Sequence, residues 1–210
     1  MDGKQQLGSQ TAKNGFKNEQ DIVRKFNNWK LDDEAQKWLS LMEYTLEEIK
    51  FVKAIILKGN FKSDIQVQIT IKLKEAIDVE NIQVKLVSNL KGFNQIDKRW
   101  VNEFSEKEKN ILLGWLKNNK ALIVNDILKG RGKFAAEWML IAQKVEDNAR
   151  WILKPMNYCL NFFGNGEIII TKRGNFKIGK ITMQRKGGDN GRKTAQMLQF
   201  KINPAELFNN

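Results

Sequence analysis

The sequence predicts an α/β (α+β) protein with a mixed sheet flanked by helices and a β-rich, basic second half. Two observations carry this expectation. Apolar residues recur at helical spacing near the start of the chain and again after Ser105. Elsewhere they alternate with polar residues, as they do in half-buried strands. We expect an α/β region over 1–104 and a β-rich region over 105–210. The two regions form either separate lobes or one compact unit.

The first half begins with a loose lead-in over 1–12 and continues as helices. Residues 14–29 carry apolar side chains on one helical face, and Asp32 or Asp33 is a suitable cap for a second helix. A third helical stretch is expected over 45–52. Two alternating segments follow at 63–72 and 81–87, and the short connection between them favours an antiparallel hairpin.

The second half is predicted from Ser105 onward. Ser105 and Glu108 form a capping-box pattern, which begins a helix, and 120–129 is also expected to be helical. The remaining elements are expected to be a helix near 155–163 and five strands with turns between them. The strands are expected at 134–145, 149–153, 167–172, 176–186 and 194–202, with turns at 173–175 and 187–192.

Composition excludes several kinds of chemistry and favours a polyanionic partner. The chain of 210 residues has no His, which rules out His general bases and Ser-His-Asp triads. The single Cys159 allows neither an internal disulfide nor a zinc site of Cys and His ligands. The formal net charge is +12, and the stretch from Lys172 to Lys201 holds nine basic residues and one acid. We expect no membrane span and no signal peptide, a cytoplasmic location, and a surface that faces nucleic acid phosphates.

One group of polar residues is placed to bind a metal ion. Gln83 and Lys85 share a face of their strand, and a turn near residue 74 would set Asp64 opposite them. A carboxylate and an amide oxygen can hold Mg²⁺, and a lysine can stabilise charge on a phosphate. Spacing alone favours the simpler alternative, a surface ion pair between Asp64 and Lys85 with Gln83 solvated.

A longer resemblance favours the metal site. The sequence at Ser63-Asp64, at Gln83-Val84-Lys85 and over 87–99 resembles the small monomeric type II restriction endonucleases that cut GCGC. These enzymes belong to the PD-(D/E)xK nuclease superfamily, and in this branch Gln replaces the usual acid. The likeness extends through most of the chain, at 7–19, 126–138, 148–152 and 184–201.

The resemblance implies roles for named residues. Asp64, Gln83 and Lys85 would be the catalytic group, with Asp64, Gln83 and Glu19 as ligands of Mg²⁺. Phe93 would be a wedge inserted into the DNA stack; the alternative is a loop anchor packed into the core. Two polar loops would contact double-stranded DNA. Their residues are Phe93, Asn94, Gln95 and Lys98 in the first loop, and Gln184, Arg185, Lys186, Asp189, Asn190 and Arg192 in the second.

The sequence departs from this family after Trp100, where members carry a further helical stretch and this chain runs almost directly into Glu103. A monomeric, Mg²⁺-dependent endonuclease with a cognate DNA methyltransferase is the function that the resemblance implies. Because of the shortening, the alternative is a protein of the same fold that binds DNA but has lost the ability to cut it. An RNA- or ribosome-binding protein is a third possibility, although no RNA-binding motif is present.

Overall fold

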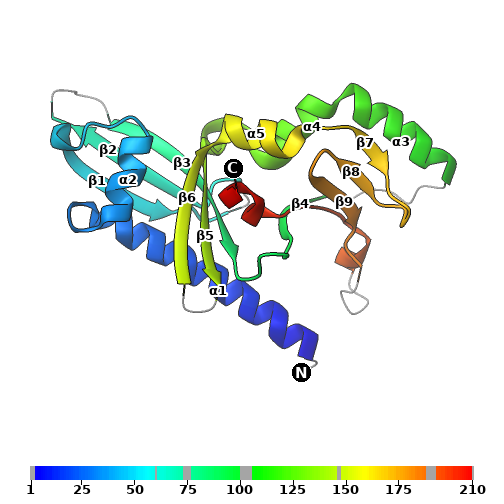
Figure 1. The fold of residues 1–210 in the computed structure, drawn as a ribbon, viewed down its shortest axis with the longest axis horizontal. Helices are drawn as coiled ribbons and strands as arrows, with labels where there is room; N and C mark the ends of the chain where they lie inside the picture. The colour runs from blue at the N-terminus through cyan, green and yellow to red at the C-terminus, as the bar shows by residue number, and fades with distance from the viewer. Residues whose placement is uncertain are drawn as a thin grey trace. The chain divides into compact units, whose positions relative to one another are not determined.

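The computed structural model describes residues 3–59, 61–72, 77–99, 106–145, 148–187 and 193–209. Its contacts divide the chain into two compact units, and each unit consists of two separate segments of the sequence. Unit 1 holds Met1–Ser88 and Gly132–Pro155, and unit 2 holds Asn89–Arg131 and Met156–Asn210. The expected regions 1–104 and 105–210 follow chain order, whereas these units interleave along it. The predicted α/β class is confirmed, because each unit contains a sheet with helices (Figure 1).

Unit 1 is built on a five-stranded mixed sheet in the order β1-β2-β3-β5-β6. Strand β2 pairs antiparallel with both β1 and β3, while β3 pairs parallel with β5. The strands are β1 (Ile49–Ile56), β2 (Ile65–Ile71), β3 (Ile77–Val87), β5 (Trp138–Val145) and β6 (Asn148–Pro155). The helices are α1 (Gly3–Asn27) and α2 (Asp33–Leu41).

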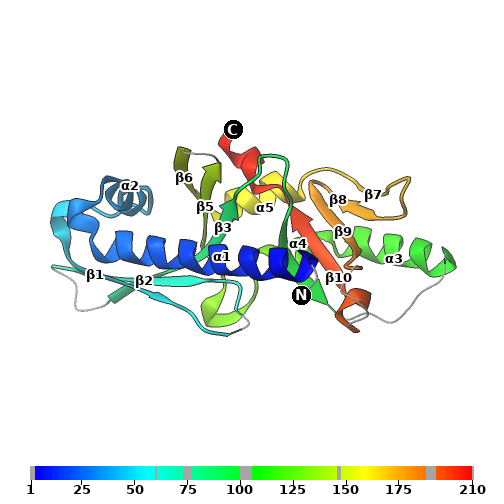
Figure 2. The same cartoon turned by 90° about the horizontal axis from the view of Figure 1, so that it is seen from below.

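The core of unit 1 lies between the sheet and these two helices. Strand β2 alternates buried Ile65, Val67 and Ile69 with less buried glutamines and a threonine, as the sequence pattern predicts. Phe26 of α1 and Trp38 of α2 pack with them in one hydrophobic cluster. Figure 2 shows α1 running along strands β1 and β2. The carboxylate of Asp32 accepts the Ala35 N–H at 3.0 Å, which confirms the predicted cap of the second helix.

Unit 2 is built on a five-stranded antiparallel sheet in the order β4-β10-β9-β8-β7. Its strands are β4 (Asn94–Arg99), β7 (Ile168–Ile170), β8 (Phe176–Ile178), β9 (Ile181–Arg185) and β10 (Leu198–Ile202). Its helices are α3 (Glu106–Asn118), α4 (Lys120–Leu128) and α5 (Met156–Gly164). Met183, Leu198 and Phe200 of the sheet line a pocket of about 340 Å³ together with α3 and α4 residues. This sheet therefore has one apolar face and one polar face.

Three predictions from the first half of the chain were wrong. Residues 1–12 were expected to be a loose lead-in, but α1 already begins at Gly3. The stretch 45–52 was expected to be helical; a short 3-10 turn at Leu46–Glu48 leads directly into β1. Residues of high strand propensity there pair with β2, and this tertiary pairing overrides the helical pattern. Residues 94–99 were expected in a polar loop and instead form strand β4, because they pair with β10.

Two predicted strands of the second half differ in the structure, because one is divided and the other begins later than expected. The expected strand at 176–186 is split into β8 and β9 at Gly179, which has a φ of +56°. A Cβ there would lie 2.2 Å from the Asn165 carbonyl oxygen, so only glycine fits this turn. The expected strand at 194–202 begins with a 3-10 turn at Lys193–Gln196 before β10. Ser105 lies outside the described residues. Within the described part of the chain, no helix has both the length and the apolar composition to span a bilayer.

Candidate active site

The site takes its geometry from the hairpin of β2 and β3. In the observed register Ile65 pairs with Ile82, which sets Asp64 beside Gln83 as the sequence predicts. Strand β2 begins at Ile65, whereas β3 continues through Val87 paired only with β5. The edge of β3 facing Asp64 therefore has no strand beside it over its last residues.

The carboxylate of Asp64 occupies this free edge. Its Oδ2 accepts the backbone N–H of Val84 at 2.6 Å, where a neighbouring strand would otherwise provide a carbonyl. The Asp64 backbone also pairs on both sides, since its N–H donates to Ile82 and its carbonyl accepts from Leu57. Asp64 is thus fixed between the two residues predicted to act with it, Gln83 and Lys85.

A short segment that begins at Gly132 fixes both arms of this hairpin. Ser63, the residue before Asp64, donates its hydroxyl to the Phe134 carbonyl at 3.0 Å. Asn81, two residues before Gln83, donates its side-chain amide to the Lys133 carbonyl at 3.1 Å. The Glu137 carboxylate accepts the Asn81 N–H at 2.9 Å. These bonds limit the movement of Asp64 relative to Gln83.

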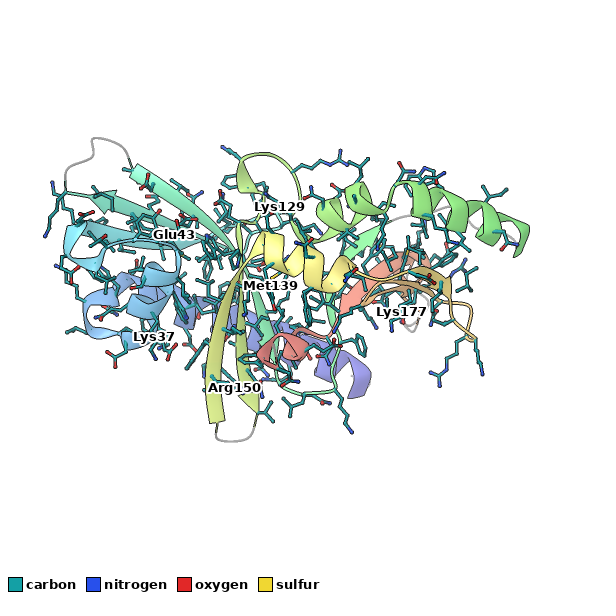
Figure 3. All side chains as sticks on the ribbon, turned by 45° about the horizontal axis from the view of Figure 1, so that its top comes forward. Lys37, Glu43, Lys129, Met139, Arg150 and Lys177 are labelled. Carbon is teal, nitrogen blue, oxygen red and sulfur yellow. The ribbon has the colours of Figure 1, made fainter. Side chains whose placement is uncertain are left out.

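Gln83 is buried, with 2% of its surface exposed, and its Oε1 has no hydrogen-bond partner. Its neighbours on β5 explain this, because Gln83 pairs with Met139 (labelled in Figure 3) and Lys85 pairs with Ile141. Both β5 residues are fully buried and apolar. An unpartnered buried oxygen costs about 1–3 kcal/mol. The alternative with a solvated Gln83 is therefore wrong, and its oxygen is free to bind a ligand.

Three charged groups act on one another at this hairpin. Burial raises the pKa of Asp64 from its usual value, and Lys85 opposes that rise. Burial also raises the pKa of Glu19, to about 7; the nearby Asp64 adds to the increase and Lys85 reduces it. Glu19 on α1 therefore lies within electrostatic range of both residues. In the described part of the chain Asp64 and Lys85 form no salt bridge, so the surface ion pair considered above is not what the structure has.

This donor set fits Mg²⁺, a hard ion that takes oxygen ligands. Glu19 and Asp64 offer carboxylate oxygens and Gln83 offers an amide oxygen. Within the described residues no group of three His, Cys, Asp or Glu side chains could hold a metal. An ion at this position would therefore depend on the glutamine oxygen, which is the one left without a partner.

The predicted DNA-contacting residues of unit 2 are only partly brought together. Gln199 in the middle strand pairs with Lys98 on one side and Gln184 on the other, so these three share one face of the sheet. Lys201, two residues along, pairs with Gln95 and Thr182 on the same face. Gln199 and Lys201 lie on this face and were not predicted there; Gln199 is buried and its side chain donates to the Lys186 carbonyl. Their alternation with the apolar Leu198, Phe200 and Ile202 could have revealed them.

Other predicted residues lie apart from this face. Arg185 pairs with Leu198 and by alternation points to the opposite face from Gln184. Lys186 follows the end of β9 and donates its N–H to the Met197 carbonyl. Phe93 is 55% exposed, just before Asn94 begins β4, so the core-anchor alternative is wrong. Asp189, Asn190 and Arg192 lie outside the described residues, as does Trp100.

Comparison with known proteins supports the expected family. The profile of the R.HinP1I restriction endonuclease family matches residues 42–107 and 101–208, which together are most of the chain. The two matches meet at 101–107, where the shortening after Trp100 is expected. The likeness at 7–19, which includes Glu19, lies before the matched residues. No curated protein matches the chain.

Proposed function

The chain belongs to the R.HinP1I restriction endonuclease family and is a type II site-specific deoxyribonuclease acting on double-stranded DNA, and from this premise we propose its site, cofactor and recognition sequence. Asp64, Gln83 and Lys85 are the catalytic group, and Mg²⁺ is the cofactor, held by Asp64, Gln83 and Glu19. The enzyme hydrolyses DNA at a GC-rich tetranucleotide, GCGC. The observation that carries this proposal is the buried, unpartnered Gln83 Oε1 beside Asp64.

Hydrolysis replaces one P–O bond with another. A water oxygen bonds to phosphorus, and the bond from phosphorus to the leaving sugar oxygen breaks. When bound, Mg²⁺ lowers the pKa of such a water and polarises the phosphate. The Lys85 ammonium stabilises negative charge that develops on the phosphate oxygens. Asp64 keeps its position during these changes because the Val84 N–H holds one of its oxygens.

Recognition of DNA belongs to the polar face and loops of unit 2. Gln95, Lys98 and Gln184 lie on that face and carry donors and acceptors suited to base edges or phosphates. The exposed Phe93 acts as a wedge between base steps. Asn94, the first residue of β4, contacts the DNA beside Phe93.

Guanine and cytosine edges are read by the segment 184–192, which starts with the last two residues of β9. Arg185, Lys186 and Arg192 donate to guanine O6 and N7, while Asp189 accepts from cytosine N4. Asn190 is the remaining DNA contact that we propose in this segment.

Further proposals concern the oligomeric state of the enzyme, its partner protein and its location. The protein acts as a monomer that cuts the two strands in separate events. A cognate DNA methyltransferase protects the same sequence in the host. Because unmethylated duplex DNA that enters the cell is the substrate of such an enzyme, we place the activity in the cytoplasm.

The test uses two plasmids that differ only in carrying or lacking GCGC. We expect nicking, then linearisation, of the GCGC plasmid with Mg²⁺, and no cleavage of either plasmid with EDTA. Cleavage of both plasmids alike would contradict the recognition sequence. An intact GCGC plasmid that is still shifted in a gel would favour the DNA-binding alternative that the shortening after Trp100 suggests.

A further inference from the structure

The polar face of the unit 2 sheet carries a row of side chains that the proposed recognition of DNA does not yet use. Strand pairing sets Lys177 of β8 (labelled in Figure 3) opposite Thr182 of β9, and Thr182 opposite Lys201 of β10. Lys201 in turn lies opposite Gln95 of β4, so the row crosses four neighbouring strands on one face. Neighbouring strands are about 4.8 Å apart, which makes the row about 14 Å long.

The two lysines of this row have no acid beside them. Within the described residues, neither Lys177 nor Lys201 forms a salt bridge. The acid of β4, Asp97, is paired with Phe200 and lies on the opposite, apolar face, where it binds Arg99. Like charges on one face repel each other, and a bound polyanion relieves that repulsion.

A second row on the same face has a different chemistry. Two residues away on β9 and β10, Gln184 lies opposite Gln199, which lies opposite Lys98 on β4. The Gln199 amide is already bonded to the Lys186 carbonyl, so Gln184 and Lys98 are the groups of this row that remain for DNA. An amide pairs a donor with an acceptor and suits base edges, whereas the ammonium and hydroxyl donors of the first row suit phosphate oxygens.

We propose that Lys177, Thr182 and Lys201 form a phosphate track, along which the sugar–phosphate backbone of duplex DNA crosses the sheet at right angles to its strands. Each lysine neutralises a phosphate, and the Thr182 hydroxyl between them donates to a phosphate oxygen. The row ends at Gln95, two residues after the exposed Phe93, so the track leads to the proposed wedge. The inference rests on the proposal that the polar face of unit 2 contacts DNA.

The test is fluorescence anisotropy of the full chain in EDTA over a range of salt concentrations, with one duplex that contains GCGC and one that lacks it. Lys177→Ala should weaken binding to both duplexes by the same factor and lower the salt slope by about one. Combining it with Lys201→Ala should lower the slope by about two. Thr182→Val keeps the shape of the side chain and removes the hydroxyl, so it should weaken both complexes about threefold without changing the slope.

Two variants control for charge and for side-chain loss. Lys117 is exposed on α3, a helix that packs on the apolar face of the same sheet. Lys117→Ala removes the same charge as Lys177→Ala and should leave affinity and slope close to those of the wild type. Lys177→Arg keeps the charge at the row and should keep the slope.

The outcomes separate the track from the proposal on which it rests. If Lys177→Ala changes the slope no more than Lys117→Ala does, or weakens the GCGC complex far more than the other one, the track is overturned. If Lys98→Ala and Gln184→Ala also bind the GCGC duplex as the wild type does, the polar face is not the DNA-contacting surface, and the inference fails with that proposal.

Discussion

Glu19 is a residue whose charge opposes folding. Its pKa is raised from 4.5 to about 7, chiefly by burial and then by Asp64. Between these values the folded protein holds a proton on Glu19 that the unfolded chain releases. The free energy of unfolding therefore falls, through this group, as the pH rises from 4.5 to 7. A cost of ionising Glu19 without an ion beside it is what the proposed role of Glu19 as a metal ligand predicts.

Glu19→Gln should remove this dependence on pH. Without divalent ions at pH 8, we expect the variant to be more stable than the wild type by on the order of 1–2 kcal/mol, allowing for solvent screening. The difference should shrink toward zero near pH 4.5. Urea unfolding of both proteins at pH 4.5 and pH 8 measures it. A variant less stable than the wild type at pH 8 would contradict the assigned burial.

Phe93 provides a second test at the scale of one residue. Because its side chain is 55% exposed, Phe93→Ala should change the free energy of unfolding by less than about 0.5 kcal/mol. If Phe93 unstacks a base step, cleavage of a GCGC duplex should fall about tenfold or more. Phe51 on β1 is 56% exposed and serves as the control, since Phe51→Ala should leave both quantities unchanged. Equal cleavage by wild type and Phe93→Ala would exclude the wedge.

At the scale of elements, the hairpin that forms the site was predictable and its surroundings were not. Alternation fixes which residues of 63–72 and 81–87 share a face, and a short connection leaves few registers, so Asp64 and Gln83 could be set together. The burial of Gln83 depends on pairing with β5, more than fifty residues later in the chain. No local pattern encodes that parallel pairing. The same is true of β4, whose polar residues become a strand only beside β10.

The length of α1 is open to a direct test. The helix runs through Gly15 to Gly3, whereas the sequence predicted helix only from residue 14. An added Cβ at Gly15 meets no atom, so Gly15→Ala should stabilise the protein by about 0.5–1 kcal/mol through helix propensity alone. Thermal or urea unfolding of the EDTA-treated protein measures the change. No gain in stability would mean that the helix does not persist through this position.

At the scale of the whole molecule, the excess of positive charge is concentrated in one stretch of the chain. The net charge is +12, and Lys172 to Lys201 carries nine basic residues against one acid. Several of these lie on unit 2 strands, such as Lys177 on β8 (labelled in Figure 3) and Lys201 on β10. Unit 1 instead holds the acids of the proposed metal site, Glu19 and Asp64. Composition alone predicted a polyanionic partner, and the family match identifies it as duplex DNA.

This charge predicts a steep dependence of DNA binding on salt. Phosphate contacts release counterions, so six to ten of them would weaken affinity by about 10³–10⁵ between 50 and 200 mM salt. Fluorescence anisotropy with a duplex that lacks GCGC, in EDTA, gives the slope. Lys201→Ala should reduce the slope by about one contact if that lysine faces a phosphate. Affinity that barely changes with salt would contradict a phosphate-facing surface.

The central claim is that Asp64 serves catalysis through its charge rather than through its support of the fold. Asp64→Asn keeps an oxygen to accept the Val84 N–H and removes the charge. Single-turnover cleavage of a GCGC duplex with Mg²⁺ compares the two proteins, with duplex binding in EDTA as the control. We predict that Asp64→Asn binds the duplex as the wild type does. Its cleavage rate should fall by about 100-fold or more. Cleavage at the wild-type rate would place the chemistry elsewhere in the molecule.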